Sequence, residues 1–599
     1  MRVPRGGLRL LVPVVSGLTL AGCGSEPASA PPAAAPAAEA WFVDATASSG
    51  IDFVHFNGMS GSFYLPEIMA PGVGLLDYDR DGDLDVFFPQ GRMLGTGRSL
   101  EDARLRPTER QLPLRGRLYR NDLAADGART LRFTDVTASS GLDARGYGMG
   151  VAAGDVDNDG CVDLYVTNLG PNQLFRNNCD GTFTDVSRAS RVDDPGWGVS
   201  AAFLDFDRDG WLDLYVGNYV EYRPDADIEC TSVTGGRDYC PPRVYRAQRD
   251  RLYRNLGTGV FADVTARALV GGDFGPALGV STADFNGDGW IDVYVANDGQ
   301  ANQLWINQRD GTFRNTALLA GVALSADGRA EASMGVDAGD ADNNGTDDLF
   351  VTNLTGETHV LYVNDGSGIF EDRRGRAGLA APTVAYTGFG AAWIDVDNDG
   401  WLDLLTVNGT IVRHQAAPAD HPFPYDQRRQ LFRNLGDGRF EEATARAGAA
   451  FAPSEVGRGA AFGDLDNDGD ADVVVANASG PARVLLNQVG SRSPWLGLRL
   501  TGGPAAPRDL LGARVAIRRR DGVTLWRRVR ADGSYASAND PRILAGLGAS
   551  AEPPDVRVVW PDGRTDEWTA VPIDRWTTLA PGTDRQGAAP GARGRGSTD

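Results

Sequence analysis

The sequence predicts an all-β protein, in which a seven-bladed β-propeller precedes a small C-terminal β-rich domain. The first observation is an acidic pattern that recurs at intervals of 50 to 79 residues, beginning at Asp77, Asp155, Asp205, Asp284, Asp340, Asp395 and Asp464. The second is that the same segments surround each copy: a Gly/Ala-rich apolar run, the acidic loop, a β-branched or aromatic run ending in Asn, a run like QLFRN, and a run like GTFTDVT. Four short strands per unit, repeated seven times, are typical of a β-propeller.

These segments are too short for helices, and Gly, Asn or Asp bounds each of them, which favours strands joined by tight turns. The ends of the repeat region indicate that a ring closes. The seventh unit stops at Ala482–Gln488 without a run like GTFTDVT, and an extra run of that type, WFVDATASSG, stands at Trp41–Gly50. We therefore expect the N-terminal strand to complete the last blade, with the propeller spanning residues 41–490.

The acidic loop has the pattern DxDxDGxxD. Positions 1 and 9 are always Asp, position 6 is always Gly, and positions 3 and 5 are Asp except at Asn286 and Asn344. Hard oxygen donors around a tight glycine turn are typical of Ca²⁺ sites, whereas Mg²⁺ demands stricter octahedral geometry. Position 7 varies freely, as expected where a backbone carbonyl is the ligand. An EF-hand is excluded because position 12 carries no Glu and lies in an expected strand.

The alternative is a set of Asp/Asn/Gly turns that side-chain hydrogen bonds hold without metal. Seven copies of the same acidic positions argue against it, because like charges this close repel one another. Up to seven structural Ca²⁺ ions would reduce the formal net charge of −22 to −8. The predicted ligands, with position 7 acting through its carbonyl, are Asp77, Asp79, Asp81, Asp83, Asp85, Asp155, Asp157, Asp159, Cys161, Asp163, Asp205, Asp207, Asp209, Trp211, Asp213, Asp284, Asn286, Asp288, Trp290, Asp292, Asp340, Asp342, Asn344, Thr346, Asp348, Asp395, Asp397, Asp399, Trp401, Asp403, Asp464, Asp466, Asp468, Asp470 and Asp472.

Acidic loops that lead into runs such as DLYVTN (Asp163–Asn168) resemble the FG-GAP/VCBS repeats of integrin α-subunit propellers. The resemblance covers residues 41–488 and implies Ca²⁺ ligands at the matching positions of the second copy, Asp155 to Asp163. CPPRVY (Cys240–Tyr245), followed by RLYRNLGTGVFADVT (Arg251–Thr265), further resembles the cartilage acidic protein family and its bacterial relatives.

The repeat pattern ends before Trp495, and no further acidic loop follows. WLGLRLTG, LGARVAIR, GSYASAND, GLG and VVWPDGRTDEW follow one another in that order, with alternating apolar positions and frequent turns. This succession resembles the UnbV/ASPIC domain, expected over residues 494–580. The Gly/Arg/Pro-rich residues 581–599 are expected to form a disordered tail.

The N-terminus predicts export. Arg2, Arg5 and Arg9 precede a short apolar segment, so residues 1–22 are typical of a signal peptide. LAGC resembles a bacterial lipobox and predicts lipidation of Cys23, with ordinary cleavage beside an incidental Cys as the alternative. Residues 23–40 are expected to be a Pro/Ala-rich linker. Gly24 favours the outer membrane or cell surface, with contact to membrane only through the lipid.

The four other cysteines suit an oxidising compartment and allow three pairings. Two local disulfides are favoured. A hairpin turning about residues 169–172 would bring Cys161 opposite Cys179, and Cys230 would then pair with Cys240 across one loop.

Three insertions, Pro89–Arg117, Tyr219–Asp250 and Gly409–Arg429, occupy the class of turn opposite the acidic loops. We expect them to gather on one face and to offer aromatic and arginine side chains for binding. The alternative is that they only cap the fold. The side chains in question are Tyr219, Tyr222, Tyr239, Tyr245, Arg413 and Tyr425.

Little points to catalysis, and we predict no catalytic residue. There are four histidines, His55, His359, His414 and His421, of which the last two share an insertion, and no nucleophile elbow or P-loop is present. The net charge of −22 argues against nucleic acid. The sequence predicts an exported, calcium-binding lipoprotein that binds or adheres to an extracellular protein or glycan through the insertion face. The alternatives are an enzyme or biosynthetic accessory protein, and a structural envelope protein.

Overall fold

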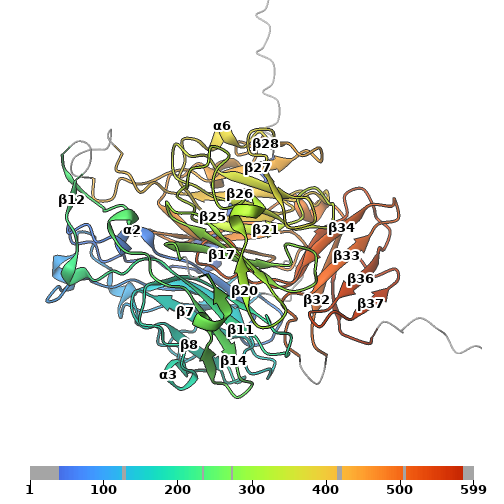
Figure 1. Ribbon diagram of the computed structural model, residues 1–599, viewed down its shortest axis with the longest axis horizontal. Helices are drawn as coiled ribbons and strands as arrows, with labels where there is room; N and C mark the ends of the chain where they lie inside the picture. Colours follow the sequence, from blue (N-terminus) through green and yellow to red (C-terminus); the bar gives the residue numbers. More distant parts are fainter. Residues whose placement is uncertain are drawn as a thin grey trace, which may run out of the picture. The chain divides into compact units, whose positions relative to one another are not determined.

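The computed structural model describes residues 39–123, 130–231, 235–271, 274–414, 421–503 and 507–583. The chain divides into a short unit, Met1–Glu39, and a large unit, Ala40–Asp599, which is described here. The predicted signal peptide, Cys23 and most of the linker and tail lie outside the described residues. The all-β prediction is confirmed, because antiparallel sheets make up the large unit (Figure 1).

Seven sheets follow one another along the chain, and each contains four antiparallel strands of one repeat. The first strands are β2 (Gly74–Leu76), β6 (Gly148–Gly154), β10 (Gly198–Leu204), β17 (Ala277–Ala283), β21 (Val336–Gly339), β25 (Gly388–Ile394) and β29 (Gly457–Gly463). The second strands are β3 (Asp85–Phe88), β7 (Asp163–Asn168), β11 (Asp213–Asn218), β18 (Asp292–Asn297), β22 (Asp348–Val351), β26 (Asp403–Asn408) and β30 (Asp472–Asn477).

The outer strands complete these sheets. The third strands are β4 (Arg117–Asn121), β8 (Gln173–Asn177), β14 (Arg251–Asn255), β19 (Gln303–Asn307), β23 (Val360–Asn364), β27 (Gln430–Asn434) and β31 (Arg483–Asn487). The fourth strands are β5 (Phe133–Asp135), β9 (Phe183–Asp185), β15 (Phe261–Asp263), β20 (Phe313–Asn315), β24 (Phe370–Asp372), β28 (Phe440–Glu442) and β1 (Phe42–Asp44), and β16 (Leu269–Val270) adds a fifth, parallel strand beside β20.

Helices are confined to single turns between the sheets. They are α1 (Thr46–Ser49), α2 (Pro66–Met69), α3 (Ser187–Ser190), α4 (Thr265–Ala268), α5 (Ala317–Ala320) and α6 (Ala380–Thr383), with 3₁₀ turns η1 (Leu100–Asp102), η2 (Glu109–Gln111), η3 (Pro224–Ala226), η4 (Pro242–Val244), η5 (Gly448–Phe451) and η6 (Gly490–Arg492).

The N-terminal strand lies in the sheet of the last repeat, as predicted from the sequence. Phe42 in β1 pairs with Asn487 in β31, and Asp44 pairs with Leu485. The first and last parts of the repeat region are therefore held together by backbone hydrogen bonds.

The first strands pack against one another in chain order, and β29 also contacts β2, so the series of contacts returns to its start. Small residues make this approach feasible. A Cβ on Gly150 would lie 2.2 Å from the carbonyl oxygen of Val199, and one on Gly335 would lie 1.9 Å from that of Phe389. The Gly/Ala-rich composition of the first strands thus follows from close backbone contact between neighbouring sheets.

An asparagine at the end of each third strand links every sheet to its neighbour. Asn255 Nδ2, for example, donates to the carbonyl of Val156, the second position of the preceding acidic loop, at 2.8 Å. The contact from Asn121 to Leu465, also at 2.8 Å, joins the first repeat to the last. The other pairs are Asn177–Tyr78, Asn307–Phe206, Asn364–Phe285, Asn434–Ala341 and Asn487–Val396.

The C-terminal residues form two further sheets, with strand orders β34-β33-β36-β37 and β35-β32-β38. Their strands are β32 (Trp495–Leu500), β33 (Arg514–Arg518), β34 (Thr524–Arg528), β35 (Ile543–Gly546), β36 (Asp555–Val559), β37 (Thr565–Trp568) and β38 (Trp576–Leu579). In Figure 1 this module lies on the side opposite β12 (Cys230–Thr231), which pairs with β13 (Arg237–Asp238) in the second insertion.

The loop of residues 530–540, here called the central loop, hydrogen-bonds to all seven first strands. The amide of Val151 in β6 donates to Ala536 at 3.0 Å, and the amide of Val336 in β21 donates to Ser534 at 3.0 Å. The remaining five first strands are contacted at Leu75, Ser200, Thr282, Ala391 and Ala460. This contact between the C-terminal module and the repeats was not predicted from the sequence.

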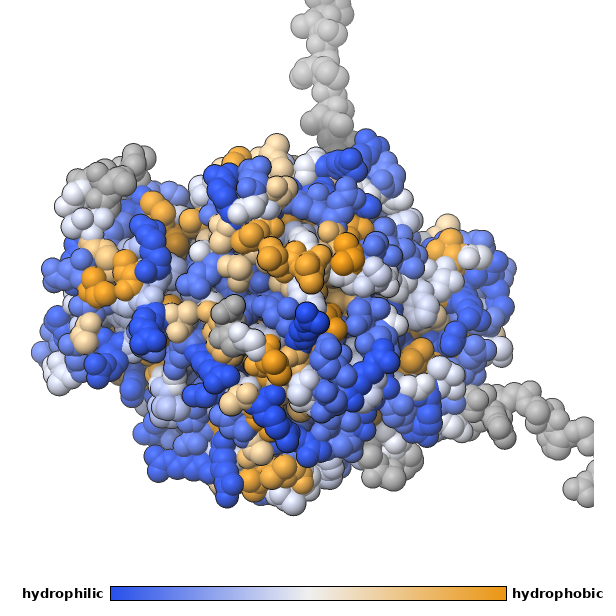
Figure 2. Space-filling view, in the orientation of Figure 1, coloured by the Kyte–Doolittle hydropathy of each residue, from blue (hydrophilic) through white to orange (hydrophobic). Residues whose placement is uncertain are grey.

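Both predicted disulfides are present. Cys161 bonds to Cys179 and Cys230 bonds to Cys240, with Cα atoms 5.7 Å and 5.2 Å apart. Figure 2 shows a predominantly hydrophilic face broken by small hydrophobic groups. The most exposed large apolar side chains are Leu318 and Leu319.

Candidate metal centres and insertion face

The seven acidic loops share one turn geometry. The glycine at position 6 has a φ between 89° and 97° in every loop, which explains why no other residue occurs there. The side chain at position 5 accepts the amide of position 7, as Asp159 Oδ1 does from Cys161 at 2.9 Å. The side chain at position 5 therefore stabilises the turn. A side-chain hydrogen bond of this kind is what the alternative of turns without metal predicts.

The aspartate at position 9 is a buried brace. Asp163 accepts the amides of Val156 and Asn177, each at 2.8 Å, and ties the loop to the third strand. The same two bonds recur in all seven loops, at Asp85, Asp163, Asp213, Asp292, Asp348, Asp403 and Asp472. Burial raises the pKa of Asp213 to about 9.

Positions 1 and 3 carry the oxygens that the protein leaves without partners. Buried carboxylate oxygens of Asp77, Asp79, Asp205 and Asp207 accept no hydrogen bond, and Asp157, Asp395 and Asp397 behave alike. In the loops that begin at Asp77, Asp155, Asp205 and Asp340, ligand oxygens of positions 1, 3 and 9 lie within 4.8 Å of one another. This set of hard, converging oxygens fits a calcium ion.

Arginines of the repeats approach some of the same loops. Arg433 Nε lies 2.8 Å from Asp397 and its Nη2 lies 2.9 Å from Asp399. Arg254 pairs in the same way with Asp207 and Asp209. These arginines occupy the position before the terminal Asn of the third strand, and they offset part of the negative charge of the loop.

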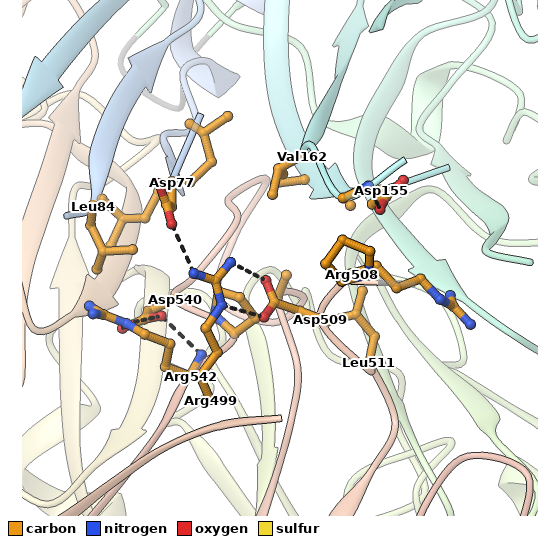
Figure 3. Close-up of a pocket in the computed structure, with 18 of the residues that line it drawn as sticks. Asp77, Leu84, Asp155, Val162, Arg499, Arg508, Asp509, Leu511, Asp540 and Arg542 are labelled. Atoms are coloured by element: carbon orange, nitrogen blue, oxygen red, sulfur yellow. Dashed lines mark hydrogen bonds and ion pairs between the residues drawn. The ribbon is translucent and has the colours of Figure 1, made fainter. Parts of the chain in front are cut away.

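Arginines of the C-terminal module reach the loops from the other side. Figure 3 shows Arg499 between Asp77 and Asp509, at 3.0 Å and 2.9 Å, around a cavity of about 30 Å³. Burial raises the pKa of Asp155 and of Asp205, each to about 6, and the positive charge of Arg508 opposes both rises. Further contacts are made by Arg514 with Asp284, Arg527 with the carbonyl of Gly400, and Arg542 with the carbonyl of Asp464.

The C-terminal module thus covers the acidic loops. Arginines of the repeats and arginines of the module both offset the negative charge of these loops. Sequence reasoning missed both sets. The only sequence signal was the recurrent Arg of the QLFRN-like run.

The three insertions meet on the opposite side, as expected. Thr96 of the first donates to Asp225 of the second at 2.6 Å, and Tyr425 of the third donates to Asp238 at 3.0 Å. The first and second insertions enclose a cavity of about 780 Å³.

The expected aromatic binding groups are largely interior. Tyr219 and Tyr425 are 0% and 2% exposed, and Tyr222 is also buried. They pack with Met59, Ile68 and Tyr535 in a cluster beneath the insertions. The prediction that Tyr219 and Tyr425 are available to bind a ligand is therefore wrong. Their buried rings pack in this cluster and anchor the insertions to the repeats.

The four histidines do not converge on one another among the described residues. His55 and His359 are buried, and desolvation lowers the pKa of each to about 3. His414 Nε2 lies 2.7 Å from the carbonyl of Asp426, whereas His421 Nδ1 accepts the amide of Phe423.

Glu67 in α2 is a buried acid that the sequence analysis overlooked. Tyr239 donates to its carboxyl at 3.1 Å, and its Oε1 has no partner in the described structure. Desolvation raises the pKa of Glu67 to about 8, so the carboxyl is largely protonated at neutral pH.

Comparison with known families agrees with this architecture. The FG-GAP-like repeat family matches residues 155–216, 244–295, 284–351, 342–406 and 423–475, which contain six of the seven acidic loops. The ASPIC and UnbV family matches residues 503–586. The chain carries FG-GAP-like repeats followed by an ASPIC and UnbV domain. The resemblance stated from the sequence is confirmed in these terms.

Curated relatives match about half of this chain. Cartilage acidic protein 1 of mouse is 28% identical over 318 residues, which cover 52% of this chain and 46% of the mouse protein. The human protein is 28% identical over 318 residues, covering 52% and 45%. The chain thus matches less than half the length of these relatives.

Among solved structures, an Agrocybe aegerita lectin that recognises non-reducing terminal N-acetylglucosamine aligns with 58% of this chain and 84% of its own, at 17% identity and a TM-score of 0.32. This likeness is too low to bear on ligand choice. Within the described part of the chain, no helix is long and apolar enough to cross a membrane.

Proposed function

We propose that the chain is an exported, calcium-binding seven-bladed β-propeller that acts as an extracellular binding or adhesion module for a protein or glycan. The acidic loops would hold structural Ca²⁺, and the insertion face would bind the partner. The observation that carries the proposal is the division of the molecule into a charged, covered side and an open side with a preformed cavity.

Three contacts support the closed propeller. The first strands touch in a cycle, β1 pairs with β31, and Asn121 bonds to Leu465 across the junction of first and last repeats. A linear array of sheets would leave the first and last repeats apart.

Calcium is supported by the unpartnered oxygens at positions 1 and 3. The predicted ligands at these positions and at position 9 would hold the ion, with the position 7 carbonyl, while position 5 also shapes the turn. Affinities of roughly 10⁻⁴ to 10⁻³ M would suit extracellular modules. The ion would supply positive charge and rigidity.

Calcium removal tests this part of the proposal. Addition of EGTA should lower the Tm, because each occupied site adds about 1.4 kcal/mol for every tenfold excess of Ca²⁺ over its Kd. Restoring Ca²⁺ should restore the Tm, and Mg²⁺ should restore less. An unchanged Tm after exhaustive chelation would show that the loops stand without calcium.

The insertion face can be tested directly with the purified mature protein. Pull-downs and a glycan array should give a partner that Glu221→Ala/Arg223→Ala/Arg246→Ala loses, since these exposed side chains line the cavity. A matched surface variant, Arg188→Ala/Arg314→Ala/Glu552→Ala, should keep the partner. Equal capture by both variants would place binding elsewhere.

Lipidation of Cys23 and attachment to the outer membrane or cell surface belong to the same proposal. They are supported by the lipobox-like LAGC and by the basic and apolar segments before it. Metabolic labelling with a lipid precursor should mark the wild type and spare Cys23→Ser.

A second candidate is an enzyme or biosynthetic accessory protein that uses the insertion side or the ASPIC and UnbV domain. One observation favours it: Glu67 is a protonated buried acid with Tyr239 beside it. A reaction that the wild type accelerates and Glu67→Gln does not, at equal Tm, would support this candidate.

A further inference from the structure

The cavity between the first and second insertions has the make-up of a site for a particular ligand class. Its volume of about 780 Å³ lies within the range of small-ligand sites. Residues 92–96 of the first insertion form one wall, and residues 221–226 and 244–246 of the second form the other. Tyr147 and Trp197, which directly precede the first strands β6 and β10, line it as well.

The walls are held in place before any ligand arrives. Both the amide and the hydroxyl of Thr96 donate to Asp225, at 2.8 Å and 2.6 Å, and so tie one wall to the other. Tyr245 donates to Asp227 at 2.7 Å within the second wall. The Cys230–Cys240 disulfide clips the same insertion, so little ordering is required on binding.

The charge of the cavity favours an anion. Arg92, Arg223 and Arg246 are exposed on its lining, and none of them forms an ion pair within the described ranges. Two carboxylates, Glu221 and Asp225, share the cavity, and Thr96 already engages the second. In a chain of net charge −22 this is a local excess of free guanidinium, which binds carboxylates through paired hydrogen bonds.

The floor of the cavity is aromatic. Trp197 packs edge-on against Tyr219 at 5.0 Å and lies 5.3 Å from Tyr222. Its ring is 1% exposed, and its Nε1 has no hydrogen-bond partner among the described residues. Ile228 and Val244, 44% and 39% exposed, add apolar surface at the rim. Apolar surface interrupted by single polar groups suits a sugar ring, which has both C–H faces and hydroxyls.

We infer that this cavity binds a saccharide that bears carboxylates, in which the arginines pair with the carboxylates and the floor and rim contact the sugar rings. The inference rests on the proposed function, because it names the ligand class of the insertion face. A neutral glycan would leave the three guanidinium groups unused. A nucleic acid would meet repulsion from the rest of the surface.

Calorimetric titration of the purified mature protein in Ca²⁺ tests the inference with defined probes: tetragalacturonate, a sialylated trisaccharide, and each compound after reduction of its carboxyl groups. At least one acidic form should bind, and its reduced form should bind at least about tenfold more weakly, because hydrogen bonds to a charged partner are lost. Arg223→Gln/Arg246→Gln should lose affinity similarly. Arg314→Gln, on the exposed side of β20, is the matched control and should bind like wild type.

Three results would overturn the inference: equal affinity for acidic and reduced saccharides, unchanged affinity of the double variant, or no binding of either acidic probe. Binding of an acidic peptide at the same arginines, with no saccharide bound, would also overturn it. The two levels of proposal remain distinguishable. If a partner is captured through the insertion face while no acidic saccharide binds, the inference fails and the proposed function stands.

Discussion

Two side chains that recur in every repeat stabilise this fold. The asparagine at the end of each third strand and the aspartate at position 9 of each acidic loop satisfy backbone groups that would otherwise be buried without partners. The sequence displays both residues seven times, but each asparagine also bonds to a carbonyl of the neighbouring repeat. Spacing alone could therefore predict that they matter and could not predict the bond from Asn255 to Val156.

Replacement of that asparagine should destabilise the protein. Asn255 Nδ2 donates to Val156 and to Leu212, so Asn255→Ala leaves two buried carbonyls unpartnered and should lower the free energy of unfolding by about 1–3 kcal/mol. Chemical denaturation at saturating Ca²⁺ measures the change. Asn178→Ala, which removes bonds to Thr182 and Thr184 within one sheet, should cost less. Equal losses would mean that the contact between repeats adds nothing.

Glu67 should give the protein a distinct dependence on pH. Its folded pKa, about 8, lies above the ordinary glutamate pKa of 4.5, so between these pH values the folded state holds a proton that the unfolded state releases. Stability must therefore fall as pH rises through this window, by up to about 1.4 kcal/mol per pH unit. Glu67→Gln should flatten the fall in Tm between pH 5 and pH 8 relative to wild type. Exposed Glu552→Gln should leave the profile unchanged, and parallel wild-type and Glu67→Gln profiles would refute the assignment.

Among the elements, the sheets and the two disulfides follow from local sequence. Alternation, turn residues and loop lengths predict the hairpin between β7 and β8, and Cys161 meets Cys179 across it. The insertions were placed correctly on one side, but their tyrosines were not. Tyr219 belongs to a cluster with residues from several repeats, and a pattern confined to a few residues does not show such burial.

The two disulfides should differ in their contribution. Cys161→Ala/Cys179→Ala opens a loop with a sequence separation of 18 that contains the strands β7 and β8, and it should lower stability by about 3 kcal/mol. Cys230→Ala/Cys240→Ala opens a shorter loop in an insertion and should change the Tm less. Thermal unfolding of the two double variants, measured side by side, separates the effects. A larger loss from the second pair would indicate that the insertion, rather than the sheet, limits stability.

In the molecule as a whole, the contact between the central loop and the repeats is the feature that could not be predicted from the sequence. The central loop belongs to the C-terminal module by sequence and to the repeats by contact, and its partners lie up to 466 positions away. The arginines that cover the acidic loops come from the same module. The module therefore acts as part of the repeat structure, and the two are not independent domains.

Tyr535 offers a test of this integration. Its ring is fully buried against Phe389, and its hydroxyl donates to Met69 at 2.8 Å. Tyr535→Ala should lower the free energy of unfolding by about 3–5 kcal/mol, as expected for truncation of a buried aromatic side chain. Tyr386→Ala, at a partly exposed site, is the control. If the Tm of Tyr535→Ala equalled that of the wild type, the central loop would not contribute to the stability of the repeats.

The central loop also sets an order of events for the cell. Residues 530–540 are synthesised after all seven repeats, yet each of the seven first strands has a hydrogen-bond partner in them. A chain that ends before residue 530 would therefore lack these contacts in every one of its seven repeats. Under the export that we propose, the first strands would gain these contacts only once about nine-tenths of the 599-residue chain has been made.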